Sequence, residues 1–206
     1  MDLHCRPATQ RDVERVAEIV HGSPGREAIA LLGGEDPARR FGFALVRLQA
    51  NGRAWRRTVV AEQRGEVVAV LQSRLASEPV SSSWRDLARA TIQALGPIGA
   101  VGALRRDRIR RRVGIAPPAD AFHVEELHVD PGLRSRGIGG ALLDHADALA
   151  RAEGARRMSL VTHTSNRARN LYRRVGFVEI ERREDPDYER LTGIPGRLLM
   201  VKRLAP

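Results

Sequence analysis

The chain has 206 residues, 42% of them hydrophobic, and a formal net charge of +10, which suits one domain with a full core. Its single cysteine, Cys5, excludes an internal disulfide and a cysteine-rich metal site. No apolar run reaches membrane-spanning length and the N-terminus lacks the apolar core of a signal peptide, so we expect a cytoplasmic protein.

The N-terminal part combines helical and extended patterns. Apolar residues at helical spacing predict a helix between Thr9 and Gly22, and Asp36-Pro37 is a typical helix start. Two β-rich runs are joined through Arg64-Gly65, which favours a hairpin. In chain order the expected elements are a strand over 3–6, helices over 9–22, 26–32 and 36–50, and strands over 58–62 and 67–75.

The segment from about 82 to 118 is predicted to be an extended, arginine-rich helical region. Gly96-Pro97 interrupts it, and the basic run Arg105 to Arg112 follows. Such a run could bind nucleic acid, but no aromatic platform accompanies it. A solvated helix face or an amphipathic lid is therefore favoured, and an anionic membrane surface is a less favoured partner.

A strand, a basic glycine-rich turn and a helix follow one another between His123 and Leu143. The strand reads HVEELHV, Asp130-Pro131-Gly132 ends it, and RSRGIGG leads into the helix. The unpaired N–H groups at a helix start suit a phosphate ligand. The turn matches neither the nucleoside-triphosphate loop GxxxxGK[ST] nor the dinucleotide pattern GxGxxG.

The C-terminal part continues the alternation of strands and helices. We expect a strand over 157–162, a helix over 166–174, a strand over 177–181, a loop over 185–196 and a closing strand over 197–204. The stretch 181–196 is rich in acids and interleaved arginines, so it could attract a cationic amine, or its charges could pair with one another.

Two motifs in this region carry a family resemblance. The pattern Arg134-x-x-Gly137-x-Gly139 after the strand ELHVDP resembles the acyl-coenzyme A signature of the GNAT (GCN5-related N-acetyltransferase) superfamily. A second match is an asparagine, a leucine-tyrosine pair and a glycine-phenylalanine pair at the family's spacing, here Asn166, Leu171-Tyr172 and Gly176-Phe177. The order of expected elements also resembles that of the family over nearly the whole chain.

The resemblance implies an α/β (α+β) fold with a mixed, mostly antiparallel central sheet flanked by helices. A V-shaped acyl-CoA cleft is then expected between strands 123–130 and 157–162. The chain would form a single N-acetyltransferase domain over 1–206, with the segment at about 82–118 longer than the family minimum. It would act as a monomer or a homodimer.

The resemblance also implies an activity, namely transfer of acetyl from acetyl-CoA to a primary amine of a small molecule, peptide or protein. The amine would attack directly in a ternary complex, without a metal. A different acyl group stays open as an alternative. So does a non-catalytic module that senses acyl-CoA, or binds nucleic acid or a membrane, on the same fold.

Site residues follow from the matched positions. Tyr172 corresponds to the family's general acid, and a phenol is a workable proton source for a thiolate. Strand alternation predicts that Glu125 and Glu126 point to opposite faces, so that only one faces the substrate; we favour Glu125 as base, with Glu126 second and His123 as a further candidate. The expected cofactor-binding residues are Leu127, His128, Val129, Arg134, Ser135, Arg136, Gly137, Ile138, Gly139, Gly140, Asn166 and Arg169.

Overall fold

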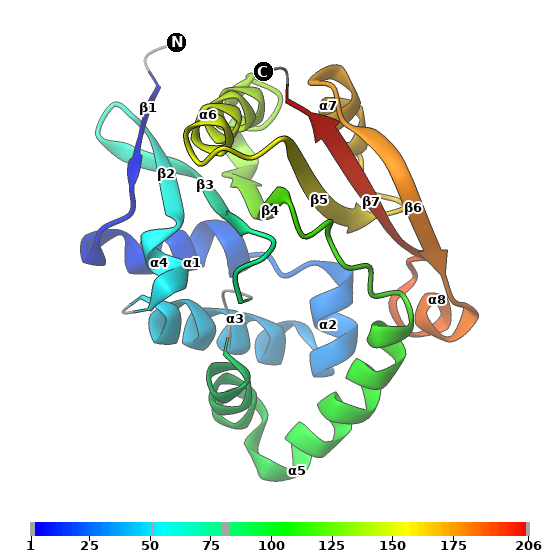
Figure 1. Ribbon diagram of the computed structural model, residues 1–206. Helices are drawn as coiled ribbons and strands as arrows, with labels where there is room; N and C mark the ends of the chain where they lie inside the picture. The colour runs from blue at the N-terminus through cyan, green and yellow to red at the C-terminus, as the bar shows by residue number, and fades with distance from the viewer. Residues whose placement is uncertain (1–2, 51, 80–82, 205–206) are drawn as a thin grey trace.

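The computed structural model in Figure 1 describes residues 3–50, 52–79 and 83–204. Its strands form one sheet in the order β1-β2-β3-β4-β5-β7-β6, and all neighbouring pairs are antiparallel except β4 and β5. The expected mixed, mostly antiparallel sheet is thereby confirmed. The strands are β1 His4–Pro7, β2 Thr58–Gln63, β3 Glu66–Leu75, β4 Ala121–Val129, β5 Arg157–His163, β6 Val178–Glu184 and β7 Gly196–Arg203.

Helices cover both faces of this sheet. On one face, α6 and α7 pack over β4 and β5 and form a core with buried Leu142, Leu143 and Phe122. On the other face, α1 and α3 pack on β2 and β3 through Val16, Val46 and other small apolar residues. The helices are α1 Val13–His21, α2 Arg26–Leu32, α3 Glu35–Gln49, α4 Arg53–Arg56, α5 Trp84–Arg112, α6 Ile138–Ala152, α7 Arg169–Arg174 and α8 Pro186–Thr192, with short 3-10 turns at Gln10–Asp12 and Pro131–Leu133.

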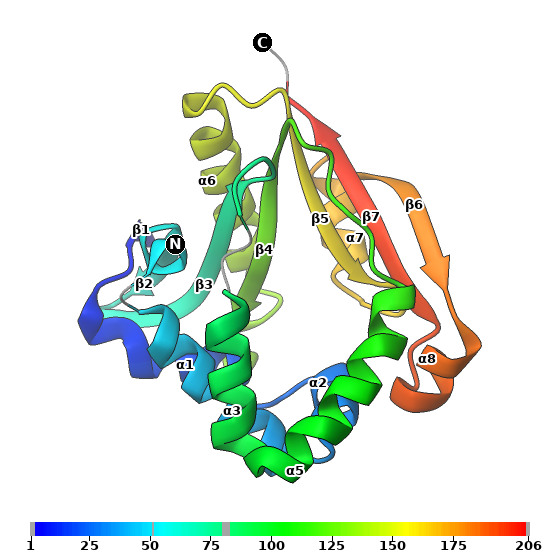
Figure 2. The same cartoon turned by 60° about the horizontal axis from the view of Figure 1, so that its bottom comes forward.

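The two parallel strands in the middle of the sheet separate along their length. β4 and β5 pair only from Ala121 opposite Arg157 to Val124 opposite Leu160. Beyond Val124 the edge of β4 that faces β5 has no strand partner among the described residues, and Figure 2 shows the two strands diverging towards α2 and α5. This separation gives the expected V shape between the strands.

The expected hairpin is present, since β2 and β3 pair antiparallel up to Gln63 opposite Glu66. Arg64 and Gly65 form its two-residue turn, and both adopt the positive φ that such a turn favours, at 54° and 82°. The expected loop over 185–196 is wrong, since it contains α8. Asp185 accepts hydrogen bonds from the N–H groups of Asp187 and Tyr188, and Pro186 occupies the first turn. The proline and glycine that indicate a loop are instead the two ends of a short helix.

Helix α5 forms an arch below the sheet (Figure 2). Gly96 has φ 66° and ψ 175°, a conformation that only glycine adopts readily, and Pro97 begins the second arm. By length and composition alone, an 18-residue stretch of α5 is apolar enough to cross a membrane. However, the kink divides it into two arms that are each shorter than the ~20 residues a membrane-spanning helix needs.

Candidate active site

A β-bulge in β4 determines how the two candidate bases point. Ser73 on β3 faces Val124 and the next residue, Gln72, faces Glu126, so Glu125 is an extra residue in β4. The extra residue interrupts the alternation of the strand. The expectation that Glu125 and Glu126 point to opposite faces is therefore wrong, and both side chains line the same cavity.

The carboxylate of Glu125 is held in a nearly buried ion pair. It accepts a hydrogen bond from Arg74 Nε at 2.7 Å, and the two side chains are only 15% and 8% exposed. The same guanidinium donates to three backbone carbonyls, those of Leu75, Ala76 and Glu78. Glu125 thus neutralises a buried cation, and its loss would leave that cation without its counter-ion.

Glu126 is more accessible, with 46% of its side chain exposed. His128 Nε2 donates to its Oε2 at 2.7 Å. Desolvation by the surrounding protein raises the pKa of Glu126, but the hydrogen bond from His128 and the positive charges of neighbouring groups lower it by more. The net result is a pKa below the ordinary value of a glutamate. The half-buried imidazole of His21 lies close by, and desolvation lowers its pKa to about 4. At neutral pH Glu126 is therefore ionised, and the nearby His21 is neutral.

Tyr172 lies on α7 and belongs to the main core cluster. Its side chain is buried and its ring packs edge-on against Phe177, with centroids 6.2 Å apart. Burial, together with the charge of Glu126, raises the pKa of Tyr172 to about 12. The phenol consequently stays protonated over the whole physiological range and can donate a proton.

The turn between β4 and α6 fits a phosphate group. Arg134, Ser135 and Arg136 are exposed, and Ser135 and Gly137 both have positive φ, at 63° and 82°. α6 begins directly after Gly137 without a side-chain cap, so its first N–H groups are open to a ligand. Gly139 has another role, because a Cβ there would lie 3.1 Å from Leu171 Cδ2, where α6 approaches α7.

The edge of β4 fits the rest of the expected cofactor. Leu127, His128 and Val129 pair with β3 on one side, and in the part of the chain that the structure describes no strand pairs with them on the other. An extended ligand could add to this open edge as a further strand, with its phosphates at the start of α6. The side chains of Leu127 and Val129 pack into the core, so only their backbone is available to such a ligand.

Two of the expected cofactor contacts are engaged within the protein. The amide of Asn166 donates to Thr162 Oγ1 at 2.7 Å and accepts from the N–H of Ala168 at 2.9 Å. The guanidinium of Arg169 donates to the carbonyl of Thr164. These bonds hold the connection between β5 and α7, and a role for either side chain in cofactor binding stays a prediction.

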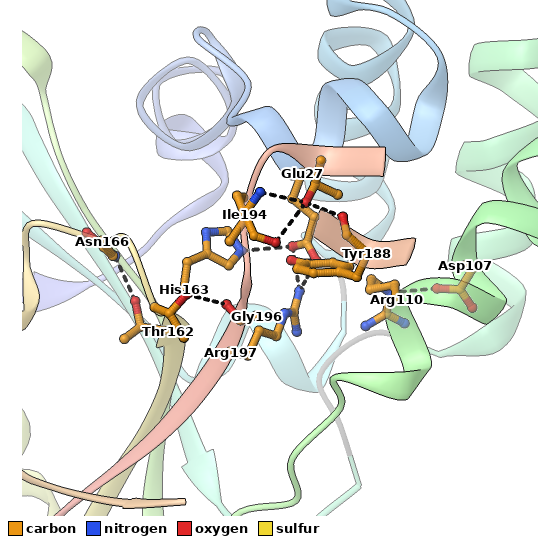
Figure 3. A network of polar contacts seen from close by, with 12 residues as sticks. Glu27, Asp107, Arg110, Thr162, His163, Asn166, Tyr188, Ile194, Gly196 and Arg197 are labelled. Atoms are coloured by element: carbon orange, nitrogen blue, oxygen red, sulfur yellow. Dashed lines mark hydrogen bonds and ion pairs between the residues drawn. The ribbon is translucent and has the colours of Figure 1, made fainter. Parts of the chain in front are cut away.

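A partly buried polar network borders the cavity, and the sequence did not indicate it (Figure 3). Glu27 on α2 accepts hydrogen bonds from Tyr188 Oη at 2.8 Å, from His163 Nε2 at 3.2 Å and from the guanidinium of Arg197. Burial alone would raise the pKa of Glu27, but His163 and Arg197 lower it to about 2. The four residues come from α2, β5, α8 and β7, so no spacing within the sequence could have predicted their meeting.

The acids of the stretch 181–196 pair with arginines. Asp187 contacts Arg112 and Arg190, each at 2.7 Å, and Glu181 contacts Arg183 at 2.7 Å. Of the two interpretations of this stretch, mutual pairing is the one that the structure supports. Within residues 3–50, 52–79 and 83–204, no group of three or more His, Cys, Asp or Glu side chains is arranged to hold a metal ion.

A cavity of about 790 Å³ lies beside Glu27, Glu125 and Glu126. Glu125 and Glu126 line one end, and α2, α3 and both arms of α5 form the walls. Among the described residues that line it, none belongs to the range 127–140. Different residues therefore line the cavity and the phosphate turn.

Comparisons with known proteins agree with this arrangement. The family model described as "Acetyltransferase (GNAT) family" matches residues 34–177. Mycothiol acetyltransferase of Beutenbergia cavernae is 42% identical over 65 residues, which cover 31% of this chain and 22% of that protein. Streptothricin acetyltransferase of Streptomyces lavendulae is 44% identical over 55 residues, which cover 26% of this chain and 29% of that protein. The chain thus aligns with less than a third of the length of either relative.

Solved structures match over the full chain at low identity. A Corynebacterium glutamicum structure described as histone acetyltransferase HPA2 and related acetyltransferase has a TM-score of 0.67 at 23% identity, covering 100% of this chain and 98% of the other. The PaiA N-acetyltransferase of Thermoplasma acidophilum, solved with coenzyme A, has a TM-score of 0.60 at 13% identity, covering 98% and 99%. These matches establish the fold.

Proposed function

The chain belongs to the acetyltransferase (GNAT) family, and on this premise we propose that it transfers an acetyl group from acetyl-CoA to a primary amine. The acceptor is a small molecule or a peptide, and the amine attacks directly while both substrates are bound. The observation that supports this proposal best is the accessible carboxylate of Glu126, whose charge acts on the buried phenol of Tyr172.

Acetyl-CoA supplies the acetyl group as an activated thioester. The exposed arginines Arg134 and Arg136 and the first N–H groups of α6 would hold its phosphates, and the open edge of β4 at 127–129 would hold the arm that follows. The backbone N–H groups on that edge are also suited to polarising a carbonyl.

Glu126 serves as the base in this proposal. A primary amine is mostly protonated at neutral pH, and the ionised, accessible carboxylate of Glu126 can accept its proton directly or through water. Glu125, the first choice from sequence, holds Arg74 in a nearly buried ion pair, which favours a structural role. Tyr172 donates a proton to the leaving thiolate, since its pKa of about 12 keeps the phenol protonated.

An acceptor screen with detection of free thiol tests the proposal. Amines and peptides are incubated with acetyl-CoA and the wild-type protein, Glu126→Gln or Tyr172→Phe. We expect thiol release with at least one amine, a fall of about 10²-fold or more in kcat for each variant, and unchanged acetyl-CoA affinity by calorimetry. If the protein binds acetyl-CoA tightly but no acceptor amine increases the release of free thiol, a non-catalytic sensor is favoured instead.

A further inference from the structure

The walls of the 790 Å³ cavity are mostly apolar, and helix α5 provides most of them. Trp84, Leu87 and Ile92 line it from the first arm, and Ala103 and Leu104 line it from the second. Leu31 and Leu32 of α2 and Phe41 of α3 complete the enclosure. A volume of this size is in the range of small-molecule sites, which are typically apolar with a few polar groups.

Several of these wall residues are exposed although they are large and apolar. Trp84 is 73% exposed, Leu104 is 63% exposed and Ile92 is 52% exposed. Exposed apolar side chains that gather on one surface mark a binding site more often than isolated ones do. These residues line the cavity, so a molecule that enters it would cover them.

The charged groups of the cavity are distributed unevenly. Arg110 and Arg111 line the second arm and share the single carboxylate of Asp107, at 2.6 and 2.7 Å, which offsets one of their two positive charges. At the β4 end, Glu125 is paired with Arg74, whereas Glu126 is accessible and hydrogen-bonded to a histidine. The cavity therefore combines apolar walls with an accessible carboxylate at the β4 end and one excess positive charge on the second arm of α5.

We propose that the acceptor is a small primary amine carrying an extended alkyl or aromatic group. The apolar group lies along the two arms of α5, and the nitrogen reaches Glu126 at the β4 bulge. This inference rests on the proposed function and adds the chemical class of its acceptor. The length of α5, with its kink at Gly96, then has a purpose, since the two arms form opposite walls of the cavity.

The first test compares amines of different length and polarity. Steady-state kcat/KM is measured by thiol release for straight-chain primary amines from propylamine to octylamine. We expect a rise of about fourfold per added methylene, the fold-change for burying one methylene group, until the walls are covered. For an ether-containing amine of the same length as octylamine, kcat/KM should be at least about tenfold lower than for octylamine. Equal kcat/KM values for the two amines would overturn the inference, while the proposed function would stand.

A matched pair of variants on α5 makes the second test. Leu104→Gln places an amide on the wall, and we expect kcat/KM for octylamine to fall about tenfold with the KM for acetyl-CoA unchanged. Ile98→Gln is the control, because Ile98 is 89% exposed on the same helix but does not line the cavity. It should retain wild-type values, and an equal loss in both variants would overturn the inference.

Binding measured without chemistry separates this inference from the proposed function. Trp84 is 73% exposed and Trp55 only 7%, so octylamine in the cavity should shift the emission of Trp84 to shorter wavelength. Trp84→Phe should abolish the shift. A shift without any acetylation of octylamine would support the apolar amine site and count against the proposed function alone. Absence of the shift at saturating octylamine would overturn the inference.

Discussion

The largely buried ion pair between Glu27 and Arg197 should stabilise the protein in a way that depends on pH. The Glu27 side chain is 14% exposed, and its pKa is lowered from 4.5 to about 2. This difference of roughly 2.5 pH units corresponds to about 3 kcal/mol of stability above pH 4.5. We expect Glu27→Gln to lose about that much at pH 7, which agrees with the roughly 3–5 kcal/mol typical of breaking a buried pair.

The sign of the pH dependence follows from the lowered pKa. A carboxyl group with a lowered folded-state pKa stabilises the protein above its ordinary pKa, and that stability is lost as the pH falls towards the folded-state value. The difference between wild type and Glu27→Gln in urea unfolding should therefore be constant from pH 7 to about 5 and shrink below about pH 4.5.

The exposed pair between Glu14 and Arg47 provides a matched control. These side chains are 63% and 56% exposed, so Glu14→Gln should leave the urea midpoint within experimental error of wild type. If Glu27→Gln unfolds at the wild-type midpoint, or loses the same stability at pH 3 as at pH 7, the electrostatic role given to this network is wrong.

Three further predictions concern the site and the sheet that supports it. Tyr172→Phe should lower kcat by about 10²–10⁴-fold and leave the dissociation constant of acetyl-CoA unchanged; an unchanged kcat would remove this residue as the general acid. Because the pKa of Tyr172 is about 12, the rate with an alkylamine should rise from about pH 6 to 9 as the amine loses its proton, and an alkaline fall beginning below about pH 9 would contradict the assignment. Gly196→Ala places a Cβ 2.0 Å from the carbonyl oxygen of Arg183 and should lower the free energy of unfolding in urea by about 1–3 kcal/mol. Gly132→Ala is the control and should lower it less, because its Cβ would make an ordinary contact at 3.5 Å. Equal urea midpoints for the two variants would show that β6 and β7 can separate at Gly196.

The sequence predicted the parts of the fold that depend on local signals. The phosphate turn, the hairpin at Arg64-Gly65 and the interruption at Gly96-Pro97 each depend on residues with restricted or unusual backbone preferences. The two halves of the family signature, around Gly137 and Tyr172, then indicated the order of the remaining elements. Alternation failed in β4, because a single extra residue in one strand leaves no mark on composition or spacing.

The parts of the site that sequence could not predict are those assembled from distant elements. Glu27 meets Arg197 across 170 positions of the chain, and Arg74 reaches Glu125 across 51. Each is an ordinary charged residue in its own segment, so only the folded sheet shows which carboxylates are paired and which is accessible. By contrast, α8 has a local sequence signal, namely Asp185-Pro186 at its start and Gly193 at its end. The same residue types also favour loops, and for this reason the helix was not predicted.

Transfer of the acetyl group to a nitrogen is the central claim, and mass spectrometry of the acceptor tests it most directly. Octylamine is incubated with wild-type protein and acetyl-CoA carrying an isotopic label in its acetyl group, and Glu126→Gln is run in parallel. We predict labelled N-acetyl-octylamine in amounts equal to the free thiol released, and far less of it with the variant. Release of thiol and labelled acetate without any labelled amine, across octylamine and the other acceptors of the screen, would contradict the account.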